Sequence, residues 1–385
     1  MQSRPWIPSL FVTQTGLCLA AGVASAQGLP PGWQRPPLVD VHVHTSPSHY
    51  DTTSDLLAAT GVSRFVNLSG GAPGDGLEEA LEAAHEYDGR VLVCVNPEWE
   101  KAGEPDFGQK QAEMLAQAAA MGARCVKVAK ALGLGVPDPS DPEKYLAVDD
   151  PRLDPMWAAA GRLGLPVFIH TGDPKAFFEP LSPANERWDE LEVHPGWSFA
   201  DARYPRLETL LAQRDHVLSK HPGTTFIGVH FGCFPENLEY TDRALAEHPN
   251  LWVDVAARVP EIGRHDPQKL HDLIVKYQDR VLFGTDLGVG RGLMLGSTGR
   301  EKPNVADAFL FFADHFRFFE TRDTNIPHPT PIQGRWTVNA IGLPADVLAK
   351  LYSGNALRLL WREDGPSDLD RRALRDAPTP ADYFP

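Results

Sequence analysis

The sequence predicts a protein of the α/β class, a (β/α)8 TIM barrel, on three observations. Short β-branched runs alternate with longer amphipathic segments, which is the pattern of parallel strands joined by helices. Eight such runs occur in the 385-residue chain, and eight strands close a barrel. No glycine-rich dinucleotide fingerprint follows the first run, which favours the barrel over an open doubly wound sheet.

The predicted strands and helices follow one another in a regular order, and glycine or proline stands at nearly every junction between them. Amphipathic helices are predicted at Leu77–Tyr87, Phe107–Met121, Pro155–Leu163 and Asn237–His248. The eight strands are predicted at Leu38–His44, Arg64–Ser69, Val91–Asn96, Cys125–Ala131, Pro166–Thr171, Thr225–Phe231, Leu251–Ala257 and Val281–Asp286.

The composition fits one large globular domain with a substantial core, since 42% of the residues are hydrophobic and 23% are charged. The formal net charge is −15. Nucleic acids and anionic membranes would be repelled by that average charge. The expected partner is therefore a small-molecule substrate, and assembly into a homo-oligomer is left open.

The N-terminus has the layout of a secretory signal peptide at residues 1–26. An apolar run from Phe11 to Val23 is followed by small residues at Ala24 and Ala26, with cleavage expected before Gln27. A membrane anchor is the alternative, although the apolar run is short. We expect a secreted or periplasmic protein with no membrane contact after cleavage. A linker at residues 27–37, a barrel domain at 38–362 and a charged tail at 363–385 would follow.

Three cysteines remain after the predicted cleavage: Cys94, Cys125 and Cys233. Their spacings match no zinc knuckle and no disulfide framework. Cys94 and Cys125 fall inside predicted apolar strands, where a thiol usually packs as a small hydrophobic group. We expect free thiols in the core.

The first strand carries the earliest sign of chemistry. Within the run LVDVHVH, alternation places the valines on one face and Asp40, His42 and His44 on the other. Two imidazoles at the end of one strand give a divalent metal two nitrogen ligands at a fixed separation. Two surface histidines on a polar face would produce the same pattern, so the pattern alone leaves both interpretations open.

Further polar residues stand at the ends of other predicted strands, where barrel active sites form. The chain has 14 histidines, and chance would place about one of them at these positions. Four stand there: His42, His44, His170 and His230, with Asp286 at the eighth strand and Lys127 in the fourth. Each alone could cap a helix or bind a loop carbonyl. Together they predict one site at the barrel mouth.

The phrases VDVHVH, LPVFIHTGD, FIGVHFG and VLFGTD resemble motifs of the amidohydrolase superfamily, and most closely its amidohydrolase-2 branch of metal-dependent barrel hydrolases and decarboxylases. The resemblance extends from about Val39 to Leu360. It implies that His42 and His44 bind one metal ion, and that His170 and His230 bind a second ion or the substrate. It also implies that Asp286 is both a ligand and the catalytic base, with His230 as a further catalytic residue. The implied cofactor is zinc, as one or two ions, or manganese.

Lys127 is the predicted bridge between two such ions. In the run CVKVAKAL, Lys127 shares a face with Cys125 and Ala129, whereas Lys130 points the other way if the strand continues. A free ammonium beside two cations would be repelled. The phrase VKVA resembles the one that carries a carboxylated lysine in binuclear members of the superfamily. A plain lysine beside one metal is the alternative.

Three functions are compatible with this set of residues. The first is hydrolysis of an amide, ester, lactone or related bond by metal-activated water. The alternative is non-oxidative decarboxylation of an aromatic or unsaturated acid, and the second alternative is an inactive barrel that only binds. Arg258, after the seventh strand, is predicted to bind a substrate carboxylate or phosphate, unless it is a surface or capping arginine.

Two connections are long for a barrel. Residues Gly172–Pro205 follow the fifth strand and are rich in aromatic and charged side chains, so they could form a lid over a flat substrate or merely cover apolar surface. The glycine-rich segment at residues 288–304 follows the eighth strand and is expected to be mobile.

Overall fold

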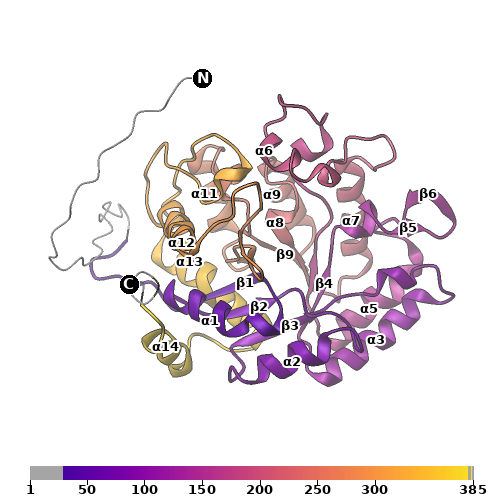
Figure 1. Cartoon of the computed structure of the whole chain (residues 1–385), viewed down its shortest axis with the longest axis horizontal. Helices are drawn as coiled ribbons and strands as arrows, with labels where there is room; N and C mark the ends of the chain where they lie inside the picture. The colour runs from indigo at the N-terminus through magenta and orange to yellow at the C-terminus, as the bar shows by residue number, and fades with distance from the viewer. Residues whose placement is uncertain (1–28, 380–382, 384–385) are drawn as a thin grey trace.

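Eight parallel strands form a curved sheet with helices around it (Figure 1), which confirms the predicted (β/α)8 fold. The computed structural model describes residues 29–379 and 383, so the predicted signal peptide lies outside the described residues. The sheet order is β10-β9-β8-β7-β4-β3-β2-β1-β11-β12. The eight barrel strands are β1 (Leu38–Thr45), β2 (Val62–Asn67), β3 (Val91–Val95), β4 (Cys125–Val128), β7 (Val167–Ile169), β8 (Phe226–Gly228), β9 (Leu251–Asp254) and β10 (Val281–Leu282).

Each of the eight strands overlaps its prediction, but most end earlier than predicted. β4 ends at Val128, and a short helix, α4 (Ala131–Leu134), begins three residues later. Similarly, the helical turns α8 (Val229–Gly232) and α10 (Val259–Ile262) begin soon after β8 and β9 end. His170, His230 and Asp286 therefore stand after the ends of β7, β8 and β10, where the backbone is free to turn. His42 and His44 lie within β1.

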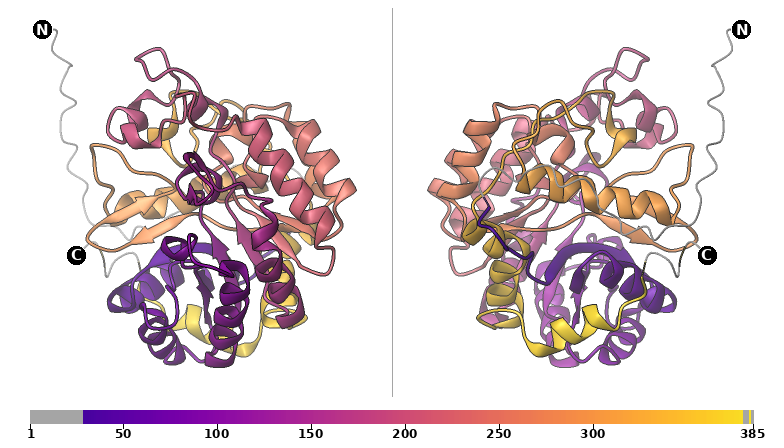
Figure 2. Two further views of the ribbon diagram at one scale, coloured as in Figure 1. Left: turned by 90° about the vertical axis from the view of Figure 1, so that its right-hand side faces the viewer. Right: turned by 90° about the vertical axis from the view of Figure 1, so that its left-hand side faces the viewer.

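Isolated backbone hydrogen bonds, and not a regular ladder, join β1 to the residues that follow β10. Val41 N donates to Phe283 O over 3.1 Å, and Asp286 N donates to His42 O over 2.9 Å. Beyond this seam, β1 pairs in parallel with β11 (Leu287–Val289), which forms an antiparallel hairpin with β12 (Leu293–Leu295). Figure 2 shows this hairpin in orange at one side of the barrel. The start of the glycine-rich segment is thus a paired hairpin, not a mobile loop.

The helices cover the sheet because their apolar sides pack on its outer face. Their starts carry sequence signals: Asp266 accepts hydrogen bonds from the backbone of α11, and Asn304 and Asp307 form a capping box on α12. The main helices are α1 (Tyr50–Ala59), α2 (Leu77–His85), α3 (Phe107–Met121), α5 (Asp154–Leu163), α7 (Leu207–Lys220), α9 (Leu238–Glu247), α11 (Pro267–Lys276), α12 (Val305–Glu320) and α13 (Ala345–Ala349). No helix in the described part of the chain is both long and apolar enough to span a membrane.

The long connection after β7 lies against the loops of neighbouring strands. It contains the short helix α6 (Trp188–Leu191). Arg187, which is fully buried, contacts Glu190 over 2.9 Å and Glu261 over 2.7 Å. Glu190 in turn contacts Ser297 beyond the β11–β12 hairpin. Removing one member of such a buried ion pair would leave an uncompensated charge, so these contacts hold the connection in place.

The C-terminal tail contains a helix, α14 (Asp368–Arg375), which packs on β2. Arg64 on β2 is buried and its Nε lies 2.6 Å from Asp370 Oδ1. Arg64 also contacts Glu363 over 2.8 Å. The described part of the tail is therefore attached to the barrel through β2 and α1.

The prediction of free thiols is wrong for Cys94 and Cys125, which form a disulfide. β3 and β4 are adjacent and parallel, and their register places Cys94 directly opposite Cys125. The two Cα atoms are 4.4 Å apart, within the range that a disulfide spans. Cys233 is free and buried, as predicted.

Candidate metal centre

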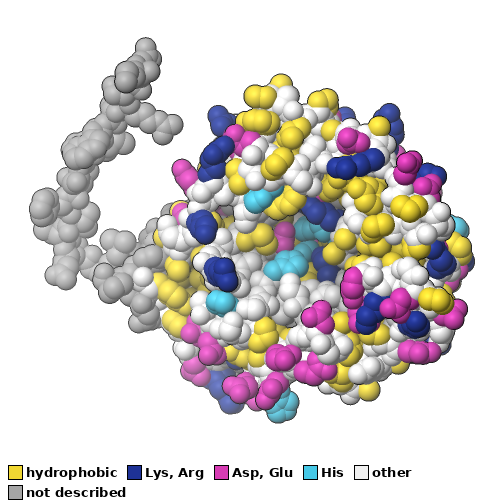
Figure 3. All heavy atoms as spheres, turned by 45° about the vertical axis from the view of Figure 1, so that its right-hand side comes forward, with side chains coloured by type: hydrophobic (Ala, Val, Ile, Leu, Met, Phe, Trp, Pro, Cys, Tyr) yellow, Lys and Arg dark blue, Asp and Glu magenta, His cyan; other side chains and the backbone are white. Residues whose placement is uncertain are grey.

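The ends of the barrel strands bring the predicted site residues to one mouth. Figure 3 shows a hollow in this face in which histidine, acidic and basic side chains lie together. The ring centroids of His42 and His44 are 5.3 Å apart, those of His42 and His230 are 4.7 Å apart, and those of His170 and His230 are 4.5 Å apart. Four histidines from three strand ends therefore form one contiguous cluster.

His42, His44 and Asp286 are spaced as ligands of one metal ion. Asp286 Oδ1 lies 3.6 Å from His42 Nε2 and 3.5 Å from His44 Nε2. These separations are long for hydrogen bonds. They are close to the separation of about 3.4 Å expected between two ligand atoms around a tetrahedral ion with bonds of about 2.1 Å. The nitrogen and oxygen donors present thus fit a divalent metal.

The histidines are held neutral, which is the form that binds metal. Burial, with the charge of Lys127, lowers the pKa of His44 to about 3. Burial lowers the pKa of His42 well below its ordinary value, and the charge of Lys127 adds to the effect. The pKa of His230 is lowered by burial and then by the charge of Arg258. Their lone pairs are therefore available at neutral pH.

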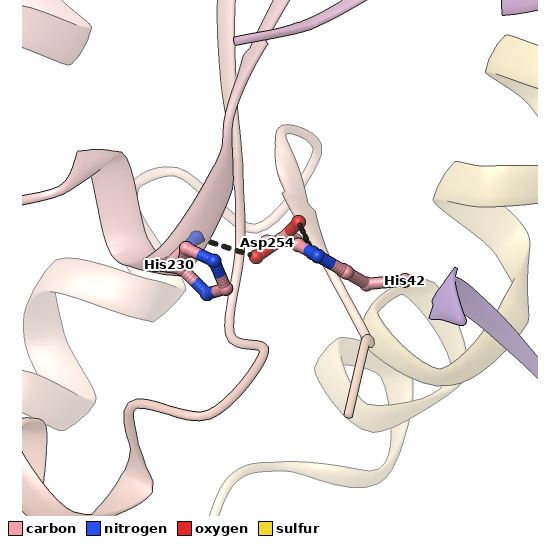
Figure 4. Close-up of side chains that lie close together, drawn as sticks. All are labelled: His42, His230 and Asp254. Carbon is pink, nitrogen blue, oxygen red and sulfur yellow. Dashed lines mark hydrogen bonds and ion pairs between the residues drawn. The ribbon is translucent and has the colours of Figure 1, made fainter. Parts of the chain in front are cut away.

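Asp254 is a site residue that the sequence analysis missed. It ends β9, is fully buried, and its Oδ2 lies 2.9 Å from His42 Nδ1. Its Oδ1 accepts hydrogen bonds from the backbone N–H groups of His230, over 2.8 Å, and Ala256, over 3.1 Å. Figure 4 shows Asp254 between the two histidines, with one contact to each. The sequence signal that could have revealed Asp254 is an acidic residue inside an otherwise apolar predicted strand.

His230 and Asp286 both have left-handed backbone conformations, with φ of 57° and 63°. Non-glycine residues seldom adopt this region, and at functional sites the surrounding structure holds them there. His230 Nδ1 lies 2.9 Å from Ala256 O. Because a carbonyl only accepts, Nδ1 carries the proton and the Nε2 lone pair is free.

His170 is at the edge of the cluster. Its Nε2 lies 3.3 Å from Asp173 Oδ1, so in this structure that nitrogen contacts a carboxylate. Asp173 also contacts Lys130 over 2.5 Å. Burial opposes the charge of Asp173, but the charge of Lys130 and the contact with His170 keep its pKa well below the ordinary value.

Lys127 and Arg258 are buried cations beside the ligand set. Lys127 Nζ lies 3.5 Å from His42 Nε2, and burial lowers the pKa of this amine. Arg258 donates from one terminal nitrogen to Ala257 O over 2.7 Å, and its other terminal nitrogen is 4.0 Å from Asp173. Its Nε has no hydrogen-bond partner.

Asp286 is a buried carboxyl group at the mouth with a raised pKa. Burial raises its pKa to about 7, although the charges of Lys127 and Arg258 lower it. An ordinary aspartate would be ionised well below neutral pH. A group that titrates near pH 7 can both accept and return a proton.

The geometry and the motifs agree with a comparison with protein families. A family model described as amidohydrolase matches residues 39–362. The chain belongs to the amidohydrolase family. No curated protein matches the sequence of this amidohydrolase.

The chain is similar to solved structures of decarboxylases and of a hydrolase. A 2,6-dihydroxybenzoate decarboxylase, complexed with 2,6-dihydroxybenzoate, has a TM-score of 0.50 at 16% identity, covering 85% of this amidohydrolase and 99% of that chain. A dihydroxybenzoic acid decarboxylase from a Polaromonas species, with bound manganese, has a TM-score of 0.49 at 13% identity, covering 87% and 99%. Dihydroorotase from Campylobacter jejuni has a TM-score of 0.46 at 12% identity, covering 86% and 85%. These likenesses concern the fold.

Proposed function

We propose that this amidohydrolase is a metal-dependent non-oxidative decarboxylase of a small aromatic or unsaturated carboxylic acid. The observation that carries the proposal is the position of Arg258. Its guanidinium is buried, and its positive charge lowers the pKa of both His42 and His230. Its Nε has no hydrogen-bond partner. A buried cation with an unused donor suits a substrate carboxylate, which a guanidinium binds through two parallel hydrogen bonds.

The other groups at the mouth fit the same reaction. A divalent ion held by His42, His44 and Asp286 would supply a Lewis acid that draws electrons from the substrate. Arg258 would orient the acid. When the carbon–carbon bond breaks, its electron pair stays on the substrate carbon and CO2 leaves. That carbon must then take a proton, which a protonated Asp286 would deliver. His230 is neutral with a lone pair at Nε2, so its role there would be to accept a proton.

The connection after β7 suits a flat substrate. Trp197 stacks on His194 with ring centroids 4.0 Å apart, and Lys130 Nζ lies 5.2 Å from the Trp197 ring centroid. Aromatic side chains near a mouth can stack on a planar ring. The 2,6-dihydroxybenzoate decarboxylase that shares this fold acts, by its name, on an aromatic carboxylate, which makes that class the first to examine.

Hydrolysis of an amide, ester or lactone is the second candidate. The observation that favours it is the contact of Asp286 with the nitrogens of both His42 and His44. A carboxylate there can accept a proton from an attacking water molecule. The unused Nε donor of the buried Arg258 is less readily explained by a neutral substrate.

A substrate panel tests the two candidates. The protein, loaded separately with zinc and manganese, is incubated with hydroxybenzoates and unsaturated dicarboxylic acids, and with lactones, esters and N-acyl compounds. Release of CO2, together with deuterium uptake at the freed carbon in heavy water, is the expected result. Acid release without CO2 would instead support hydrolysis. If neither product forms with any member of the panel, the decarboxylase proposal fails for these substrate classes.

We also propose zinc or manganese as the metal and a location outside the cytoplasm. Two imidazoles and one carboxylate suit either ion. The Cys94–Cys125 disulfide supports export, since disulfides persist in oxidising compartments. Elemental analysis of the purified protein tests the metal. Fractionation of cells that express the full chain tests the location, and recovery in the cytoplasm would contradict it.

A further inference from the structure

The described residues contain two groups that could each hold a metal, and both use His42. One is His42, His44 and Asp286, and the other is His42, His230 and Asp254. A histidine that binds metal through one ring nitrogen usually donates from the other, which fixes the ring. The two contacts of the His42 ring differ in length, so they can be distinguished.

On the Asp254 side the contact has the length of a hydrogen bond. His42 Nδ1 lies 2.9 Å from Asp254 Oδ2, whereas His42 Nε2 lies 3.6 Å from Asp286 Oδ1. A carboxylate accepts, so Nδ1 carries the proton and Nε2 offers its lone pair on the side of His44 and Asp286. Asp254 Oδ1 is already occupied by two backbone N–H groups.

The segment from Asp254 to Ala256 orients His230 as well as His42. Asp254 Oδ1 holds the backbone N–H of His230 in its left-handed turn. Ala256 O accepts from His230 Nδ1, so Nε2 is again the free nitrogen. One short segment at the end of β9 therefore orients two histidines that come from β1 and β8.

We propose that Asp254 is a positioning residue, which fixes His42 as the Nδ1–H tautomer and aims its Nε2 at the metal, and is not itself a metal ligand. The group formed by His42, His230 and Asp254 is then a hydrogen-bonded support for the metal centre. The inference concerns the metal centre alone and does not depend on whether the reaction is decarboxylation or hydrolysis.

Asp254→Asn is the sharpest variant, because the amide has the size of the carboxylate. Its oxygen keeps the two backbone hydrogen bonds, so its NH2 group must face His42 Nδ1. That nitrogen then becomes an acceptor, and the proton moves to Nε2, where it blocks metal binding. We expect zinc affinity to fall by about 10- to 100-fold, as for other changes to groups that support a ligand.

Asp40→Asn is the matched control. Asp40 is also fully buried on the same side of the barrel and accepts from the backbone N–H groups of His42, over 3.0 Å, and Thr285, over 3.1 Å. Its remaining contact is the Thr285 hydroxyl, which can rotate to suit an amide. This variant should retain zinc affinity within about threefold. Thermal unfolding of both metal-free variants shows how much stability each has lost.

The tautomer is read directly by NMR of protein with isotope-labelled histidine, at about pH 8, so that Asp254 is ionised; burial raises its pKa to about 7. Metal-free wild type should show His42 protonated at Nδ1, and Asp254→Asn should show the proton at Nε2. With a spin-active cadmium isotope bound to wild type, coupling should appear at His42 Nε2.

Coupling at His42 Nδ1 would make the other group the metal site and overturn the proposal. Loss of zinc from Asp254→Asn with the His42 tautomer unchanged would make Asp254 a ligand and overturn it too. Equal zinc affinity in Asp254→Asn and Asp40→Asn would also contradict it. Because the wild-type measurements need no variant, they decide the matter even if Asp254→Asn fails to fold.

Discussion

Lys127 Nζ lies 3.5 Å from His42 Nε2, so an amine faces the nitrogen that is best placed to bind the metal. If the protein is a decarboxylase, we expect one ion per chain and an unmodified Lys127. A carbamate on Lys127 with two ions, as predicted from the sequence, would instead favour the binuclear hydrolase. Elemental analysis combined with NMR of protein exposed to isotope-labelled CO2 measures both quantities.

His42→Ala together with His44→Ala should remove the bound metal. Both residues contact Asp286 and stand on one strand, so the double change leaves a single oxygen donor of the three. We expect zinc affinity to fall by more than about 100-fold. His216→Ala is the control, since this exposed histidine contacts Asp149 far along the chain from β1. A double variant that retained its metal would place the site elsewhere.

Arg258→Lys should weaken binding of an acidic substrate and leave metal content unchanged. A lysine ammonium cannot make the paired hydrogen bonds of a guanidinium. We expect KM to rise about tenfold, which corresponds to about 1.4 kcal/mol. Arg264→Lys is the matched control, because Arg264 is exposed and contacts Glu186. An unchanged KM in the Arg258 variant would mean that this arginine is structural.

Replacing Cys94 and Cys125 together with serine should destabilise the barrel. The disulfide closes a loop of 31 residues, and such links contribute about 2–4 kcal/mol. We expect Tm to fall by several degrees, since the chain is long. Cys233→Ser serves as the comparison for changing a buried free thiol. If the wild type melted at the same temperature with and without reductant, the disulfide would not form in the purified protein.

Much of the fold and most of the metal centre could be predicted because strands of this fold end at one face. The alternation in LVDVHVH assigns His42 and His44 to a common side, and Asp286 lies beside them after the last barrel strand. The disulfide was missed because it depends on the register of β3 and β4, which sequence spacing does not contain. Asp254 was missed because an acid in an apolar strand has no visible partner until His42 is placed beside it.

The Arg64–Asp370 pair should make the attachment of α14 sensitive to acid. Burial alone would raise the pKa of Asp370, but its hydrogen bonds with Arg64 lower it to about 2. The stabilisation is therefore complete above about pH 4, where the unfolded carboxyl is also ionised, and is lost as pH falls towards 2. We expect Asp370→Asn to cost about 1–2 kcal/mol near neutral pH.

Denaturation followed between about pH 7 and pH 2 measures this contribution. The difference between wild type and Asp370→Asn should shrink as the carboxyl is protonated. Asp368→Asn is the control on the same helix, since the Asp368 side chain is 93% exposed. A constant difference between wild type and Asp370→Asn across the range would mean that the ion pair contributes little to stability.

The seam between β1 and the segment after β10 passes through the metal centre. His42 O accepts from Asp286 N there, and the side chains of the same two residues face one another across the join. An ion bound by both side chains would tie the two edges of the barrel wall together. Loading with metal should then slow hydrogen exchange of the Val41 and Asp286 amides more than exchange within the β2–β3 ladder. The bound metal would then also hold the barrel closed.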